Sequence, residues 1–277
     1  MARIVLDAAF ARRVASAVVL GAVALQFVWL GGWAYALFVA LVVAVMAWEW
    51  GRLQPGDDSG ATIGRVAGVL SGAVAIGAVV VAEFGRPDWA IAGLLLAAAA
   101  CAVAARRVHA SRLASVLGIV YLGLPAVAMV WLRSLPGVGL AATASLLTVI
   151  WATDIFAYLV GRSVGGPKLA PRISPGKTWS GLGGGVFGAV LVTLAALVVF
   201  ARQGSFLGAL LFAGLLAVVA QMGDLFESAV KRRAGVKDSS SLIPGHGGML
   251  DRVDGLLFAA PAVALAFLVF GHEVVPW

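Results

Sequence analysis

The chain has 277 residues, of which 62% are hydrophobic and 12% are charged, and its mean hydropathy is +1.02. Soluble domains average about 45–50% apolar and about 25% charged residues, so this composition excludes an ordinary soluble domain and indicates a membrane protein. The net charge of +7 invites comparison with nucleic-acid-binding proteins. The single cysteine, Cys101, excludes a disulfide framework within the chain.

Nine apolar runs follow one another, and each is close to the roughly 17–25 residues that cross a bilayer as a helix. Backbone groups in lipid must form their hydrogen bonds internally, which favours helices over open sheet. The first run is longer than the apolar stretch of a signal peptide and lacks a small-x-small cleavage site, so we predict a retained span. The predicted fold is an all-α integral membrane protein with about nine transmembrane helices, at 14–31, 33–50, 65–83, 89–105, 113–132, 138–160, 182–201, 205–223 and 255–271.

The basic residues indicate the orientation of these spans. If the N-terminus is cytoplasmic, 17 of the 20 Lys and Arg residues fall on the cytoplasmic side, and Arg86, Arg133 and Arg202 fall on the other. This asymmetry follows the positive-inside rule, and we predict a bacterial-type inner (cytoplasmic) membrane. The positive charge then reflects topology and attraction to acidic headgroups, so we expect membrane lipids and no nucleic acid as partners.

Two regions are predicted on either side of residue 140. Residues 1–140 would form about five helices for packing, dimer contact or lipid contact, and residues 141–277 would form the catalytic region. In the first region Glu49 and Glu83 lie near span ends, where a carboxylate can reach water.

The second region contains two long polar loops, 161–181 and 231–254, each of which follows a span that ends in acids. Asp154 precedes the first loop, and Asp224 and Glu227 precede the second. Ionisable residues at membrane depth are costly and face a protein interior or a wet cavity. We therefore expect a cytoplasm-facing polar active-site cavity formed by the C-terminal half.

Residues 224–231 carry the first candidate group. In a helix, Asp224, Glu227, Ser228 and Lys231 would share one face. Because this face continues an apolar span, it needs an aqueous or protein partner, which favours a functional role over a chance surface pattern.

Two further acids, Asp251 and Asp254, would share a helical face where the ninth span begins. Converging carboxylates repel each other unless a cation neutralises them, and oxygen ligands without cysteine suit Mg²⁺. We predict a metal site made of Asp224, Asp251 and Asp254. The alternative is a set of salt bridges with Lys231 and Arg252.

The segment "PGHGG" (244–248) lies between these acids. Its glycines let backbone N–H groups approach an anion, and a helix starting near Met249 would direct its positive end to the same place. His246 could donate to a phosphate, carry a proton or serve as a structural turn residue. Cationic donors to phosphate flank the segment at Lys231, Arg232 and Lys237.

The other loop reads "GRSVGGPKLAPRISPGKTWSG" (161–181). Its cations alternate with Gly and Pro, which is typical of a fixed, irregular loop that binds a polyanion. The alternative is a loop that serves only to set topology. We expect Lys177 to contact an anionic substrate group.

Residues 228–254, "SAVKRRAGVKDSSSLIPGHGGMLDRVD", resemble the signature of the phosphatidate cytidylyltransferase (CDP-diacylglycerol synthase) family. That signature is Ser-x-apolar-Lys-Arg, four residues, Lys-Asp, a Pro-x-His-Gly-Gly turn and Asp-Arg-x-Asp. The segment "ISPGKTWSG" (173–181) is similar to the family's Ser-Pro-Lys-Lys-Thr-x-Glu-Gly segment, with Gly176 in place of Lys and Ser180 in place of Glu. With the similar stretch 153–166, the resemblance covers about residues 150–260.

The resemblance implies transfer of a cytidylyl group from CTP to phosphatidic acid, which yields CDP-diacylglycerol and pyrophosphate. It also implies Mg²⁺, with a monovalent cation such as K⁺, and a homodimer. Together with the residue chemistry above, the catalytic candidates are Asp224, Asp251, Lys237, Asp238 and His246. The candidates for substrate and phosphate contact are Ser174, Lys177, Thr178, Ser228, Lys231, Arg232, Gly247, Gly248 and Arg252.

Three alternatives stay open at this point. A related CTP-dependent transferase could act on another lipid phosphate or isoprenoid acceptor, because the apolar walls set acceptor choice. A cation-coupled transporter would place its acids near mid-span and repeat its halves, and the sequence has neither pattern. A structural scaffold would leave the anion-site chemistry unexplained.

Overall fold

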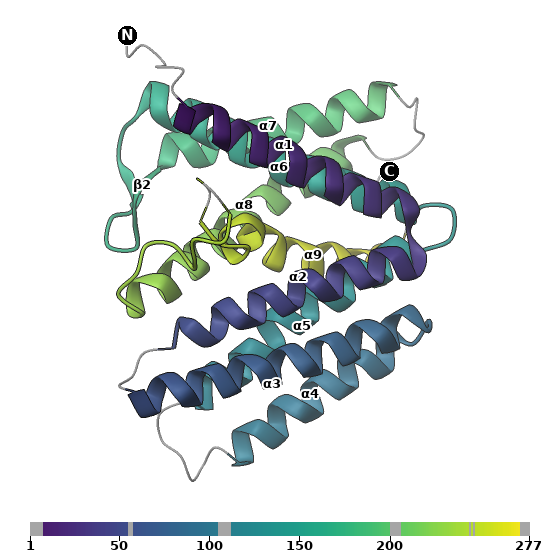
Figure 1. Ribbon diagram of the computed structural model, residues 1–277. Coiled ribbons are helices and arrows are strands. Elements are labelled where there is room, and N and C mark those ends of the chain that lie inside the picture. The colour runs from purple at the N-terminus through teal and green to yellow at the C-terminus, as the bar shows by residue number, and fades with distance from the viewer. Residues whose placement is uncertain are drawn as a thin grey trace.

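A computed structural model describes residues 8–54, 58–104, 112–199, 206–243, 245 and 247–271 (Figure 1). Nearly all of this part of the chain is helical. The helices are α1 (Ala8–Leu30), α2 (Gly32–Arg52), α3 (Asp58–Glu83), α4 (Pro87–Ala104), α5 (Arg112–Ser134), α6 (Gly139–Val164), α7 (Trp179–Val199), α8 (Phe206–Arg233) and α9 (Leu250–Phe270).

Seven of these helices have stretches long and apolar enough to cross a membrane within the described residues. The other two have shorter apolar stretches, 15–30 in α1 and 87–103 in α4. The predicted apolar runs closely match the nine described helices, because a helix that spans a bilayer needs an apolar stretch of a fixed minimum length. One helix differs in a useful way: α8 continues beyond residue 223 to Arg233, so the acidic face predicted for 224–231 is helical.

The helix ends gather at two opposite ends of the bundle (Figure 1). The strands and the C-terminal ends of α2 and α8 lie at one end, on the left of the figure. The α1–α2 and α5–α6 junctions lie at the other, where the Arg133 side chain donates to the carbonyl oxygens of Val28 (2.5 Å) and Trp29 (3.2 Å). A cation at the C-terminal end of α1 satisfies carbonyl groups that the helix itself leaves free.

Small residues allow close contact between neighbouring helices. A Cβ atom added to Gly68 of α3 would lie 2.5 Å from the Ala47 oxygen of α2, and one added to Gly185 of α7 would lie 3.1 Å from the Thr153 oxygen of α6. Such contacts stabilise helix pairs in lipid, where hydrophobic burial gives little driving force.

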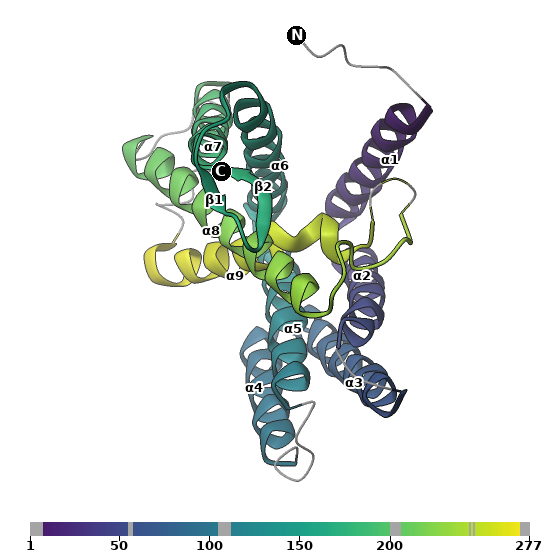
Figure 2. The ribbon, with the colours of Figure 1, turned by 90° about the vertical axis from the view of Figure 1, so that its left-hand side faces the viewer.

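The buried core runs without a break across the predicted boundary at residue 140. Leu122 of α5, Leu146 of α6 and Leu216 of α8 are all fully buried and belong to one cluster. In Figure 2, α9 passes between the α6–α7 pair and the helices α2–α5. The two predicted regions are therefore packed on each other, and the start of α9 comes close to α2.

The polar segment after α6 corrects one expectation. It was predicted to be irregular, but it contains two antiparallel strands, β1 (Lys168–Ala170) and β2 (Ser174–Thr178). Lys168 pairs with Thr178, and the amide of Ile173 donates to the Ala170 oxygen (3.1 Å) to close the turn. The prolines around the turn favoured a prediction of irregular structure, because proline is typical of turns and strand ends.

Candidate active site

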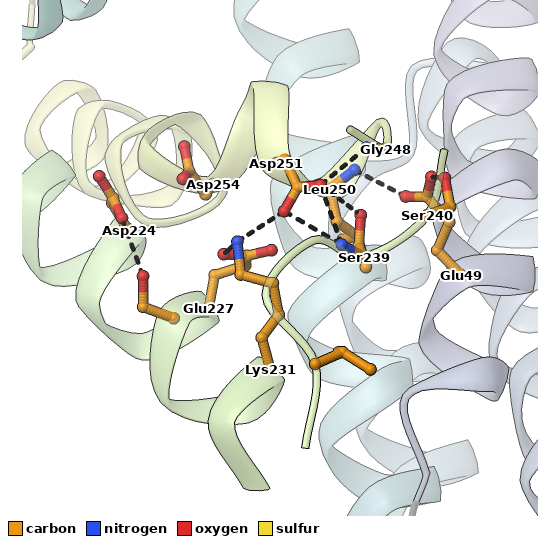
Figure 3. A network of polar contacts seen from close by, with 12 residues as sticks. Glu49, Asp224, Glu227, Lys231, Ser239, Ser240, Gly248, Leu250, Asp251 and Asp254 are labelled. Atoms are coloured by element: carbon orange, nitrogen blue, oxygen red, sulfur yellow. Dashed lines mark hydrogen bonds and ion pairs between the residues drawn. The ribbon is translucent and has the colours of Figure 1, made fainter. Parts of the chain in front are cut away.

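A polar network joins the end of α8, the loop that follows it, the start of α9 and α2 (Figure 3). Its α8 members occupy the predicted face. Ser228 donates to Asp224 (3.3 Å), and Lys231 pairs with Glu227 (2.5 Å), four residues before it. The predicted helical face is therefore confirmed.

Asp251 is the centre of this network. Its Oδ1 atom accepts from Lys231 Nζ (2.5 Å), and its Oδ2 atom accepts from the Ser239 amide and hydroxyl (both 2.9 Å) and the Gly248 amide (2.7 Å). Its side chain is only 5% exposed. Buried charges need this kind of complete pairing because the protein interior screens them poorly. Lys231 thus bridges Glu227 on α8 and Asp251 on α9.

The β-hairpin brings Lys177 onto α8. Its Nζ atom pairs with Asp224 (2.5 Å) and donates to the side-chain oxygen of Gln221 (3.0 Å). The position of Lys177 is therefore consistent with the prediction that it lies at the site. Its described partners are protein side chains, whereas an anionic substrate group was expected. Gln221, which sequence reasoning missed, lies one helical turn before Asp224 and is buried.

Three carboxylates converge beside Lys177. Asp254 of α9 interacts electrostatically with Asp224 of α8 and with Asp154 of α6. Helices α8 and α9 touch here, since a Cβ atom on Gly223 would lie 2.5 Å from the backbone oxygen of Asp254. Figure 3 shows Asp224 and Asp254 side by side. A cation bound among these carboxylates would relieve their mutual repulsion.

The donor chemistry fits Mg²⁺ at Asp224 and Asp254. Within the described ranges no three His, Cys, Asp or Glu side chains are placed to hold a metal together. Mg²⁺ needs fewer protein ligands than that, because it usually binds one or two carboxylates and completes its shell with water and substrate phosphates. Asp251, by contrast, already has protein partners on both oxygens and would have to exchange them to bind a metal.

The glycine turn corrects a second expectation. Gly245 and Gly247 have positive φ angles (78° and 83°), as a glycine-rich turn predicts. The N–H groups of Gly248 and of the start of α9, however, have protein partners. The Gly248 amide donates to Asp251, and the amides of Met249 and Leu250 donate to Glu49 (both 2.8 Å).

The other predicted residues that the structure describes belong to the hairpin, the second loop and the neighbouring helix ends. Thr178 stabilises the start of α7, where its hydroxyl oxygen accepts a hydrogen bond from the Gly181 amide (3.0 Å). Arg232 donates to the oxygens of Ile173 (3.2 Å) and Val236 (3.1 Å), which ties the hairpin to the second loop. Ser174 is partly buried in β2, whereas Lys237, Asp238 and Arg252 are exposed. His246 lies outside the described residues.

The two departures from the family segment have distinct settings. A Cβ atom on Gly176 would meet no atom within 4 Å, so this position faces open space. Ser180 donates to the Gly165 oxygen and is hydrogen-bonded to Thr178 (2.9 Å), which holds the base of the hairpin. Ser180 therefore supports the loop where the family segment carries a carboxylate.

Sequence reasoning missed Glu49, Ser239 and Ser240. Ser240 donates to Glu49 (2.6 Å), and Ser239 supplies two of the donors to Asp251. The available signal was a carboxylate inside the otherwise apolar run 33–50, which had been explained as reaching water. Glu49 is instead fully buried.

Comparison with known proteins identifies the family of this chain. A sequence model of the cytidylyltransferase family matches residues 11–270. A phosphatidate cytidylyltransferase from Brucella suis is 38% identical over 265 residues, which are 95% of each chain. One from Pseudomonas aeruginosa is 39% identical over 268 residues, 91% of this chain and 95% of that protein. One from Thermotoga maritima is 46% identical over 136 residues, about half of each chain. The chain therefore belongs to the cytidylyltransferase family.

Proposed function

We propose that the protein is a phosphatidate cytidylyltransferase, which transfers the cytidylyl group of CTP to phosphatidic acid. The observation that carries this proposal is the 38% identity to a protein of that name over 95% of both chains. The polar network at the end of α8 and the start of α9 supports it, because Lys231, Ser239 and Asp251 lie within the segment 228–254 that resembles the family signature.

In the proposed reaction a phosphate oxygen of phosphatidic acid attacks the α-phosphorus of CTP. A new P–O–P bond forms, the bond between the α-phosphorus and the oxygen leading to the β-phosphate breaks, and pyrophosphate leaves with that electron pair. The attacking phosphate is already anionic at neutral pH. Catalysis then depends mainly on positioning and on neutralising charge.

The cations divide into two groups by their contacts. Lys237 and Arg252 are exposed and would bind phosphate oxygens directly. Lys177 would bind an anionic substrate group after exchanging one of its contacts to Asp224 or Gln221. Lys231 already pairs with two carboxylates, so its role would be to orient Asp251.

We propose that Mg²⁺ is held by Asp224 and Asp254, with Asp251 and Asp154 nearby and a monovalent cation such as K⁺ as a second ion. When bound, the ion supplies charge neutralisation at the nucleotide phosphates. Asp224 would then give up part of its pairing with Lys177, and the lysine would be free to bind substrate.

We also propose nine membrane spans in a bacterial-type inner membrane, with the N-terminus and the polar network on the cytoplasmic side. The distribution of 17 of 20 basic residues supports this orientation. CTP is a cytoplasmic nucleotide, so the site must open there. A homodimer is proposed from family resemblance alone, and crosslinking in native membranes would test it.

The test is incubation of the purified protein with CTP, Mg²⁺ and phosphatidic acid, followed by measurement of pyrophosphate and CDP-diacylglycerol. We expect both products in equal amounts. A parallel reaction with a prenyl-glycerol phosphate separates the proposed acceptor from an isoprenoid one. Turnover of the second acceptor alone would contradict the proposal, and so would the absence of product from both.

A further inference from the structure

Glu49 is a carboxylate near the C-terminal end of α2, and its partners are far away in sequence. Its side chain on α2 is fully buried. Its Oε1 atom accepts from the Ser240 hydroxyl (2.6 Å) and the Met249 amide (2.8 Å), and its Oε2 atom accepts from the Leu250 amide (2.8 Å). The described hydrogen-bond donors to Glu49 therefore come from the polar loop and the first turn of α9 (Figure 3).

These contacts explain how a buried carboxylate is tolerated. The first N–H groups of a helix have no partner within the helix, and its N-terminal end favours negative charge. Met249, the N-cap of α9, makes no side-chain capping bond. Glu49 thus caps α9 from another helix, in place of the local Ser, Thr, Asp or Asn that usually does so.

The same contacts control the placement of Asp251. Leu250, held by Glu49, directly precedes Asp251 in the chain. Gly248, whose amide donates to Asp251, is packed so tightly that a Cβ atom there would collide with Glu49 Oε1 and Ser239 Oγ. A shift of the Glu49 carboxylate would therefore move the turn that supplies donors to Asp251.

We propose that Glu49 is a positioning residue for cytidylyl transfer, which holds the polar loop and the start of α9 so that Asp251 faces Lys231. This inference rests on the proposed function. Glu49 packs against Gly248, and its described hydrogen bonds are to Ser240 and the start of α9, through which it acts. The N-terminal region thereby contributes to the geometry of the active site.

The test compares Glu49→Gln with the matched variant Glu83→Gln. Glutamine keeps the size of the side chain but turns an NH₂ group toward backbone donors, so one or more of the three contacts is lost. Glu83 ends α3 at the opposite end of the bundle (Figure 1). We expect Glu49→Gln to lower kcat at least about tenfold, which corresponds to about 1.4 kcal/mol, and to change KM for CTP less than kcat. Glu83→Gln should retain normal kinetics.

Two further measurements separate positioning from a general loss of stability. Limited trypsin digestion of the full-length protein, far below its thermal midpoint, should cut the exposed Lys237 faster in Glu49→Gln than in wild type. A double-mutant cycle with Ser240→Ala should give a combined loss of kcat smaller than the product of the single losses, because the two residues share one contact.

Wild-type kcat together with wild-type digestion in Glu49→Gln would overturn the proposal. A loss of kcat that merely follows a lowered thermal midpoint, without faster cutting at Lys237, would also overturn it. If the wild-type protein makes no CDP-diacylglycerol, the proposed function fails, but the digestion experiment still decides whether Glu49 holds the loop.

Discussion

Replacing Lys231 with methionine tests the central ion pairs of the network. Lys231 is 11% exposed and lies 2.5 Å from both Glu227 and Asp251, whose side chains are 2% and 5% exposed. Methionine keeps most of the length and apolar contact of lysine but removes the charge. The variant would leave two buried carboxylates on adjacent helices without the cation that joins them.

The size of the effect follows from this burial. Removing one partner of a buried pair costs about 3–5 kcal/mol, because the remaining charge has lost its compensation. At roughly 2–4 °C per kcal/mol for a chain of this size, we expect the thermal midpoint to fall on the order of 10 °C. The double variant Lys231→Met with Glu227→Gln removes one of the two carboxylates and should recover at least half of that loss.

The assay is thermal unfolding of the purified protein in detergent, followed by loss of monodisperse protein on size exclusion. All variants should be compared in one buffer at one pH. A midpoint within about 2 °C of wild type for Lys231→Met would refute the reasoning. A double variant less stable than the single one would also refute it, since it would show that the unpaired Glu227 carboxylate is not what destabilises Lys231→Met.

Three other predictions concern the site and the topology. Lys177→Ala should lower kcat/KM at least about tenfold, the ~1.4 kcal/mol of one charge-assisted contact, and unchanged steady-state kinetics would leave the hairpin with a topological role only. Asp224→Asn and Asp251→Asn should each abolish most pyrophosphate release across a Mg²⁺ titration, and Asp251→Asn should also lower the thermal midpoint because its ion pair is lost. A normal rate with an unchanged Mg²⁺ titration in Asp224→Asn would contradict the metal assignment. Reporter fusions at residues 56 and 272 should localise to opposite sides of the membrane, and a common side would show that the number of spans is wrong.

Most of the helical architecture could be predicted from the sequence. A spanning helix must be apolar over a length set by the bilayer, and it must form its backbone hydrogen bonds within itself. Both requirements depend only on the local sequence. The face made by Asp224, Glu227, Ser228 and Lys231 could also be predicted, because it depends only on helical periodicity. The family resemblance pointed to the same segment.

Only the tertiary structure decided which groups contact one another. Periodicity places a residue on a face but does not say which helix packs against that face. Glu49 contacts the start of α9, about 200 positions away in the chain. Lys177 contacts α8 because it lies in a hairpin that was not predicted from its proline-rich sequence. The N–H groups of Gly248 and Leu250 looked available to a phosphate, but they bond to Asp251 and Glu49. A buried carboxylate takes its donors from whichever backbone the packing brings within hydrogen-bond distance, and that choice depends on the arrangement of all the helices together.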